Sequence, residues 1–257
     1  MSNKVILISI DGMRADGVQV CGNPYVEELK KIGSYTFTAG TVFPSVTLPC
    51  HMSMFHSVTP ERHGITTNVY MPQVRPINGL FEQIKLAGKV SSMYYGWEPL
   101  RDISRPSSLK AAEYINAYSF DHTDDMLTDS ALSYIKRAKP DFVFLYMVET
   151  DEKGGHDNGW MSKAYLEVVS NAINNVKRVV EEAGDEYTVI VTADHGGHDR
   201  CHGTEMDEDM TIPMFFVGDC FEAGKELENV SILDLAPTIA KILDVAPAAE
   251  WEGKILL

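Results

Sequence analysis

Three apolar segments of this 257-residue chain each end at an aspartate. VILISI ends at Asp11, FVFLYMVET ends at Asp151, and YTVIVTA ends at Asp194. Continuous apolar runs of this length predict strands that are buried on both faces, as in a parallel sheet covered by helices. Because ligands bind outside the carboxyl ends of such strands, we expect the three carboxylates to converge on one patch.

Strand-like and helix-like patterns alternate along the whole chain, which predicts an α/β fold with a mostly parallel central sheet flanked by helices on both faces. No repeat or linker interrupts the pattern, so one domain is expected over residues 1–257. Strands are predicted at 5–10, 35–42, 90–95, 142–148, 187–192 and 212–217. Helices are predicted between Asn23 and Gly33, after Thr47, and at 78–87, 121–137, 160–183 and 233–243. Residues 97–120 are predicted to be irregular.

The composition restricts the partners and the location. Lys and Arg total 22 against 37 Asp and Glu, a net charge of −15, and such a surface repels nucleic-acid polymers. No apolar run approaches the roughly 18 residues that a membrane helix needs. The segment MSNKVILISIDG lacks the features of a signal peptide, and the four cysteines form no C-x-x-C pair. We therefore expect a cytoplasmic protein with reduced thiols and no membrane partner.

Histidines lie close to the strand-end aspartates. His156 follows Asp151 by five residues, His195 adjoins Asp194, and His202 lies a little further along. Three unpaired carboxylates would raise one another's pKa, and a bound cation removes that conflict. Imidazole and carboxylate ligands together suit zinc, manganese or iron. Because one ion rarely needs so many ligands, the pattern favours two metal ions.

A hydroxyl nucleophile is the next candidate. In FPSVTLPCH, Thr47 lies between two prolines where a helix is expected to begin. The free N–H groups of a helix N-terminus can receive a phosphate, and a metal ion can activate the hydroxyl. Ser45 and Thr41 are nearby competitors for this role.

Taken together, the motifs resemble those of the alkaline phosphatase superfamily. They are Asp11-Gly12, FPSVTLPCH, HGITTN, DEKGGH, ADHGGH and Cys201-His202-Gly203, and the ending SILDLAPTIAKILDV adds a further match. The set most resembles the nucleotide pyrophosphatase/phosphodiesterase branch, which uses a threonine nucleophile. The sulfatase signature C-x-P-x-R is absent, and the phosphoglycerate mutases of the superfamily use serine where this chain has Thr47.

The resemblance implies two zinc sites and an oxyanion donor. The first zinc would use Asp11, Thr47, Asp194 and His195, and the second would use Asp151, His156 and His202. Asn68 matches the asparagine that donates to a phosphate oxygen. The chain departs from the family at one place: the usual D-x-x-G-H spacing is four, whereas Asp151 and His156 are five apart. An extra glycine in Gly154-Gly155 is expected to bulge the loop and to leave Asp151 as the ligand. Glu152 is the alternative to Asp151. His198 is the less favoured alternative to His202.

The implied activity is hydrolysis of a small phosphate ester by a two-zinc phosphodiesterase or nucleotide pyrophosphatase, through a phosphothreonine intermediate. Alternatives are a phosphomonoesterase, a phosphonoacetate hydrolase, and a non-catalytic protein that binds zinc and a nucleotide. The segment 97–120 starts at a strand's carboxyl end, so we expect it to form part of the substrate pocket. Trp97 would offer an aromatic face there, and Arg101 and Arg105 would offer donors to a second phosphate or a carboxylate.

Overall fold

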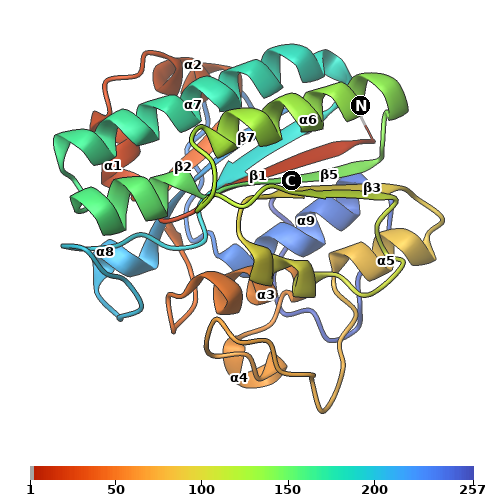
Figure 1. Ribbon diagram of the computed structural model, residues 1–257. Helices are drawn as coiled ribbons and strands as arrows, with labels where there is room; N and C mark the ends of the chain where they lie inside the picture. The colour runs from red at the N-terminus through yellow and green to blue at the C-terminus, as the bar shows by residue number, and fades with distance from the viewer. Residues whose placement is uncertain (1–2) are drawn as a thin grey trace.

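The computed structural model describes residues 3–257, in which seven strands form one sheet in the order β2-β7-β6-β1-β5-β3-β4 (Figure 1). The strands are β1 (Val5–Ile10), β2 (Ser34–Gly40), β3 (Ser91–Tyr95), β4 (Ala111–Tyr114), β5 (Phe142–Met147), β6 (Thr188–Thr192) and β7 (Thr211–Val217). All neighbouring strands are parallel except β7, which runs antiparallel to β2 and β6. The predicted α/β class with a mostly parallel sheet is confirmed.

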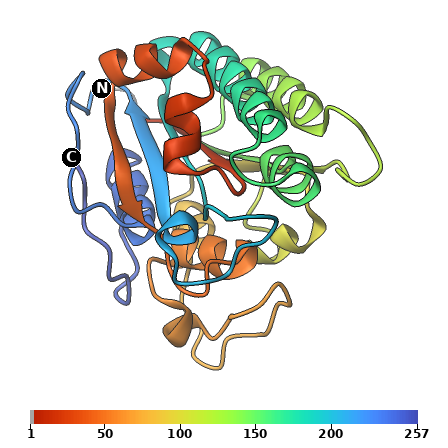
Figure 2. The ribbon, with the colours of Figure 1, turned by 90° about the vertical axis from the view of Figure 1, so that its left-hand side faces the viewer.

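Helices cover both faces of this sheet (Figures 1 and 2). One layer contains α1 (Ala15–Val20), α2 (Tyr25–Ile32), α6 (Thr123–Ala138) and α7 (Lys163–Ala183). The other contains α3 (Thr47–His56), α5 (Leu80–Leu86) and α9 (Leu235–Ile242), while α4 (Pro60–His63) and α8 (Asp207–Met210) are single turns. The 3-10 turns are Glu98–Ile103, Gly184–Glu186 and Ile232–Asp234, and Thr150–His156 is a π-helix. No helix within residues 3–257 is both long and apolar enough to cross a bilayer.

Strand β1 lies at the centre of the sheet, between β6 and β5. Every residue of these three strands is buried. They are also the three strands whose segments run into the aspartates, so the aspartates follow adjacent parallel strands and reach the same edge. The apolar residues of these strands pack them side by side in the centre of the sheet. That packing also places the three carboxylates together.

Helix α3 is buried along its whole length, all ten residues of it. Val46 precedes it in an extended conformation, and Thr47 takes the first helical position. Two histidines lie within the helix, and each is satisfied locally: His51 Nδ1 lies 2.8 Å from the Thr47 carbonyl oxygen, and His56 Nδ1 lies 2.9 Å from that of Met52. The helix can thus lie against the sheet and present its N-terminus at the edge where the aspartates gather.

The prediction that residues 97–120 are irregular is wrong in part. The segment contains the 3-10 helix Glu98–Ile103 and the edge strand β4, which pairs in parallel with β3. Strand β4 has the sequence AAEY and is largely exposed, so it lacks the apolar run or alternation that reveals a strand in a sequence. The short helices α1, α4 and α8 were likewise not predicted, because four to six residues are too few to show a helical period.

Candidate active site

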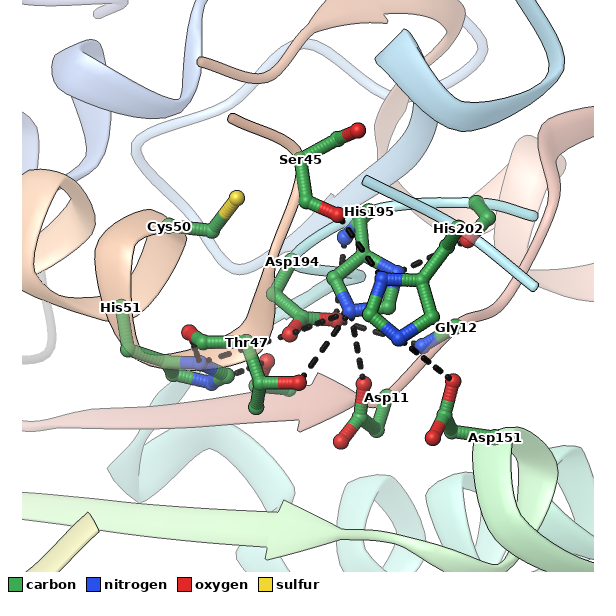
Figure 3. A network of polar contacts seen from close by, with 12 residues as sticks. Asp11, Gly12, Ser45, Thr47, Cys50, His51, Asp151, Asp194, His195 and His202 are labelled. Atoms are coloured by element: carbon green, nitrogen blue, oxygen red, sulfur yellow. Dashed lines mark hydrogen bonds and ion pairs between the residues drawn. The ribbon is translucent and has the colours of Figure 1, made fainter. Parts of the chain in front are cut away.

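The loops after β1 and β6 are linked by hydrogen bonds to the side chain of Asp194. One carboxylate oxygen of Asp194, Oδ1, accepts the N–H of Gly12 at 3.2 Å and the N–H of His195 at 2.9 Å. Figure 3 shows the side chains of Asp11, Asp194 and Asp151 turned toward a common centre. The convergence expected from the strand pattern is therefore present in the structure.

A first group of potential ligands surrounds the ring of His195. Its Nε2 atom lies 3.3 Å from Asp11 Oδ1, 3.4 Å from Asp194 Oδ2 and 3.2 Å from the hydroxyl oxygen of Thr47 (Figure 3). All four side chains are buried. We call these four residues the first ligand set.

A second ligand set comprises Asp151, His156 and His202. Asp151 Oδ2 lies 3.3 Å from His156 Nε2, and Asp151 Oδ1 lies 3.9 Å from His202 Nε2. The π-helix brings Asp151 and His156 together although they are five residues apart, because its hydrogen bonds join residues five apart, as from Asp157 N–H to Glu152 O. The carboxylate of Glu152 instead accepts the hydroxyl of Tyr118.

Each imidazole in these sets has its Nδ1 atom at a backbone carbonyl. His195 Nδ1 lies 2.8 Å from Gly196 O, His202 Nδ1 lies 2.9 Å from Ser45 O, and His156 Nδ1 lies 3.0 Å from Arg200 O. A carbonyl can only accept, so Nδ1 carries the proton in all three rings. The Nε2 atoms are then the ones that face the carboxylates, and hydrogen bonds from Nδ1 to backbone carbonyls are a common way to orient metal-binding histidines.

The residues present fit a metal centre. Three buried carboxylate oxygens, Asp11 Oδ1, Asp151 Oδ1 and Asp194 Oδ2, have no hydrogen-bond partner among the described residues. Two clusters of nitrogen and oxygen atoms are compact enough to hold an ion, one of Asp11, Asp194 and His195, and one of Asp151, His195 and His202. Buried charges need partners, and mixed imidazole and carboxylate donors suit zinc. The number and the identity of the ions stay predictions.

Without a bound cation, burial and mutual repulsion disfavour the ionised form of the clustered carboxylates. Burial raises the pKa of Asp11 well above its usual value, and the nearby charges of Asp194 and Asp151 raise it further. Burial likewise raises the pKa of Asp194. For Asp151, burial also acts upward, but the hydrogen bond from His156 and the charges of three histidines outweigh it and lower the pKa. The carboxylates are thus arranged to ionise together only beside positive charge.

Two buried polar groups behind the ligands were not found from the sequence. The Tyr146 hydroxyl donates to Asp11 Oδ2, and His51 lies with Nε2 3.0 Å from the Ser9 hydroxyl oxygen and Nδ1 3.5 Å from Asp194 Oδ2. Tyr146 and Ser9 face each other in the register of β5 and β1. The signal available in the sequence was a polar group inside an otherwise apolar, buried strand.

The hydroxyl groups near the cluster differ in what they contact. Ser45 donates to the Thr204 carbonyl at 2.7 Å, and Thr41 donates to the Asp194 carbonyl. Thr47, by contrast, directs its oxygen at His195 inside the first ligand set. Of the three candidate nucleophiles, Thr47 is therefore the one that faces the carboxylates.

Asn68 lies beside the N-terminus of α3. Its side-chain oxygen accepts the N–H of Leu48 at 3.0 Å, and the residue is exposed. With the oxygen so used, its NH2 group is available as a donor toward the solvent side. The N–H of Thr47, at the first helical position, has no carbonyl one turn earlier to bond. Both donors therefore lie at the N-terminus of α3, close to Thr47 along the chain or through Leu48.

The predicted substrate-binding residues are placed differently from one another. Trp97 is half-buried and packs against the core. Arg101 forms ion pairs with Glu98 and Asp102, and Arg105 bonds to backbone oxygen of Ile77. The structure does not bring these three together with the ligand sets, and their role stays a prediction. Tyr118 is the residue of segment 97–120 that reaches the π-helix, through Glu152.

His198, the alternative to His202, is engaged elsewhere. Its Nδ1 atom lies 2.7 Å from Asp209 Oδ1, and its Nε2 atom lies 3.3 Å from the sulfur of Cys201. Burial acts to raise the pKa of Asp209, but hydrogen bonds from His198 and Thr204 outweigh it and lower that pKa. His198 thus belongs to a separate pair that fixes the loop, while His202 faces Asp151.

Several known proteins are similar to this chain in sequence. Residues 5–212 match the family model of type I phosphodiesterase / nucleotide pyrophosphatase. Mouse ectonucleotide pyrophosphatase/phosphodiesterase family member 1 is 25% identical over an alignment of 222 positions that covers 76% of this chain and 24% of that protein. A phosphopentomutase of Alkaliphilus metalliredigens is 28% identical over 135 residues, 51% of this chain and 34% of that protein. The chain therefore spans about a quarter to a third of the length of these relatives.

A solved structure shows the same fold over nearly the whole chain. It is mouse ectonucleotide pyrophosphatase/phosphodiesterase 5, an inactive threonine-to-alanine variant in complex with AMP. The TM-score is 0.81 at 16% identity, covering 95% of this chain and 96% of that one.

Proposed function

The chain belongs to the type I phosphodiesterase / nucleotide pyrophosphatase family, a branch of the alkaline phosphatase superfamily, and on that premise we propose that it is a two-zinc phosphodiesterase with Thr47 as its nucleophile. The observation that carries the proposal is the position of the Thr47 hydroxyl, 3.2 Å from His195 Nε2 at the N-terminus of a buried helix. The inactive threonine-to-alanine variant among the structural neighbours supports a threonine in this role.

When bound, the two ions would lower the pKa of the Thr47 hydroxyl and offset the charge that develops on the leaving oxygen. The Thr47 oxygen attacks phosphorus in line, and its bond to phosphorus forms as the bond to the leaving alcohol breaks. The leaving alcohol takes up the proton that Thr47 has lost, and phosphorus stays bound to Thr47 and to the remaining ester group. Water then attacks this phosphorus, the bond to the Thr47 oxygen breaks, and a phosphate monoester leaves with the water oxygen while a proton of the water returns to Thr47. The N–H of Thr47 and the NH2 group of Asn68 donate to the non-bridging oxygens during both steps.

The charge around the nucleophile favours a diester over a monoester. A diester presents one negative charge at phosphorus, for which the neutral donor Asn68 is adequate, whereas a monoester dianion calls for a cation. Arg14, Arg62 and Arg101 could supply such a cation only by leaving the partners that they have in the structure. Arg14 pairs with Asp16 and donates to Gly197 O, Arg62 donates to Arg75 O, and Arg101 pairs with Glu98.

The proposal is tested by comparing kcat/KM for a bis-nitrophenyl phosphate diester, the nitrophenyl monoester and phosphonoacetate at one pH with saturating zinc. We expect the diester to be preferred by about tenfold or more. A clear preference for the monoester or for phosphonoacetate would replace the phosphodiesterase proposal with one of those activities. Binding of two zinc ions without turnover of any of the three would indicate a non-catalytic zinc protein instead.

The small phosphate-ester substrate and a cytoplasmic location are part of the same proposal. The excess of acidic residues, 37 against 22 basic ones, supports a small substrate over a nucleic-acid polymer. Recovery of the native protein in a cytosolic fraction of its cells, with activity on small diesters and none on DNA or RNA, would support both statements.

A further inference from the structure

Trp160 lies where three of the ligand-bearing loops meet. It follows the π-helix, has 6% of its surface exposed, and packs in the hydrophobic core. Its indole N–H donates to the carbonyl oxygen of Gly12 at 2.9 Å. Because Gly12 directly follows Asp11, this bond fixes the indole to the loop after β1.

Two further loops touch the ring at glycines. A Cβ atom at Gly155 would lie 2.4 Å from Trp160 Cζ2, and one at Gly197 would lie 2.2 Å from Trp160 Cε2. Real side chains do not approach so closely, so the indole occupies the space that a side chain at either position would need. Gly155 precedes His156, and Gly197 lies two residues after His195. The position of the indole thus gives a steric reason for a glycine directly before His156.

The ring also meets the imidazoles of the second ligand set. The indole and the His156 ring contact edge to face, with centroids 5.1 Å apart and planes at 82°, and the indole and the His202 ring do so at 6.0 Å and 64°. Such edge-to-face contacts restrict the tilt of both rings. His202 in turn stacks on His195, at 3.9 Å and 13°.

We propose that Trp160 is a positioning residue that fixes the second ligand set relative to the first and so sets the metal affinity of the second site. The inference rests on the proposed function only in taking the two sets as zinc sites. The first set has independent support, because Asp11, Asp194 and His195 stand at the ends of buried strands. The second set stands on the π-helix and on a loop, and Trp160 ties both of these to the loop after β1.

The test is Trp160→Phe, with Trp251→Phe as the matched control. Phenylalanine lacks the indole N–H and the outer ring atoms Cζ2 and Cη2 that Gly155 faces, while the Gly12 carbonyl keeps its bond from the Tyr165 hydroxyl at 3.0 Å. Trp251 makes a similar indole bond, to the Asn78 carbonyl at 2.9 Å, outside the ligand sets. Zinc alone is titrated against a chromophoric chelator, with the ligand variants Asp151→Asn and Asp194→Asn assigning each affinity to its site.

For Trp160→Phe we expect the zinc affinity of the second site to fall about tenfold or more, the usual effect of removing an outer contact of a ligand. The affinity of the first site should change by no more than about twofold, and Trp251→Phe should match wild type at both sites. The change in tryptophan emission on zinc binding should also be lost in Trp160→Phe and kept in Trp251→Phe. Unchanged affinity at the second site, or an equal loss at both sites, would overturn the proposal.

A second variant keeps the proposal testable if Trp160→Phe does not fold. Gly155→Ala leaves the indole in place and pushes a methyl group into it, so it should also weaken the second site selectively. If both variants fold, combining them should cost less than the sum of the two effects, because the smaller ring leaves room for the methyl group. Additive effects would contradict the proposed contact. Two zinc ions in wild type with no ester turnover would defeat the proposed function but leave this inference open to the same measurements.

Discussion

The two ligand sets differ in their exposure to solvent. In the first set, the side chains of Asp194 and His195 are fully buried and that of Asp11 is 3% exposed. In the second, His156 is 37% exposed and His202 is 11% exposed. Ligands on strand ends form the closed side of the centre, and ligands on a π-helix and a loop form its open side. The centre is therefore more open to solvent on the side of the second set.

The two sets also differ in how their charges are balanced before a metal binds. In the first, burial and neighbouring carboxylates raise the pKa of Asp11, and burial lowers the pKa of His195. In the second, the hydrogen bond to Asp151 raises the pKa of His156 to about 9. The second set thus contains an internal cation, the protonated ring of His156, whose proton a bound metal ion would have to displace. The first set has no such cation on its histidine, because burial disfavours protonation of His195.

The largest effect is expected at the nucleophile. Thr47→Ala should lower kcat for the diester by about 1,000-fold or more, because a covalent route is lost. The variant should keep both zinc ions, since the carboxylates and imidazoles remain. Ser45→Ala is the control, because its hydroxyl already donates to the Thr204 carbonyl. A severe loss in Ser45→Ala together with a mild loss in Thr47→Ala would show that the nucleophile is misassigned.

A large but selective effect is expected at the start of the π-helix. Asp151→Asn should weaken the second zinc by more than about 100-fold, because it removes a ligand rather than an outer contact. Glu152→Gln is the matched change one residue along, and its carboxylate faces Tyr118 instead. Equal zinc affinity in wild type and Asp151→Asn, measured by chelator competition, would remove Asp151 from the second site.

The internal cation of the second set makes its zinc affinity depend on pH. The folded-state pKa of His156 is raised from 6.5 to about 9, so its pairing with Asp151 stabilises the metal-free fold fully below pH 6.5 and is lost as the pH rises through 9. Zinc must displace that proton, so its affinity should rise about tenfold per pH unit up to pH 9 and then level off.

This pH dependence can be isolated in Asp194→Asn, in which the first site is disabled. His202 adds no slope there, because burial lowers its pKa and it is already neutral. Zinc affinity measured by chelator competition from pH 6.5 to 9 gives the slope directly. A flat profile over that range would mean that His156 holds no proton for zinc to displace.

The smallest effect is expected behind the first set. Tyr146→Phe removes the hydroxyl that donates to Asp11 and should weaken the first zinc by about tenfold. Tyr187→Phe is the control, because its buried hydroxyl donates to the Pro140 carbonyl and lies outside both sets. Isothermal titration with zinc would distinguish the two. An equal effect in both variants would point to a general loss of stability rather than to orientation of Asp11.

The first ligand set was the more predictable from sequence. Its aspartates directly follow apolar strands, and a single topological rule places such positions at one edge of the sheet. That rule needs no knowledge of strand order. The order itself, with β1 between β6 and β5, comes from packing between segments far apart in the chain, which no local pattern records.

The conformation around the second ligand set was harder to predict from the sequence. The spacing of Asp151 and His156 was recognised as unusual, but a bulged loop was expected and the structure has a π-helix. Trp160 and Tyr146 act through rings and hydroxyls that approach the ligands from other elements, so their contacts exist only once the sheet and helices have packed. The edge strand β4 was missed for a related reason, since pairing with β3 and not its own residues makes it a strand.

The π-helix Thr150–His156 absorbs one additional residue without lengthening any loop. Hydrogen bonds between residues five apart widen one helical turn, so His156 returns to the position that a spacing of four would give it in a regular turn. The additional residue thus leaves the position of the His156 side chain unchanged. It does shift the register of a residue-by-residue alignment. A search that demands a fixed spacing would pair His156 with Glu152, the side chain that faces Tyr118, and would assign a ligand to the wrong column.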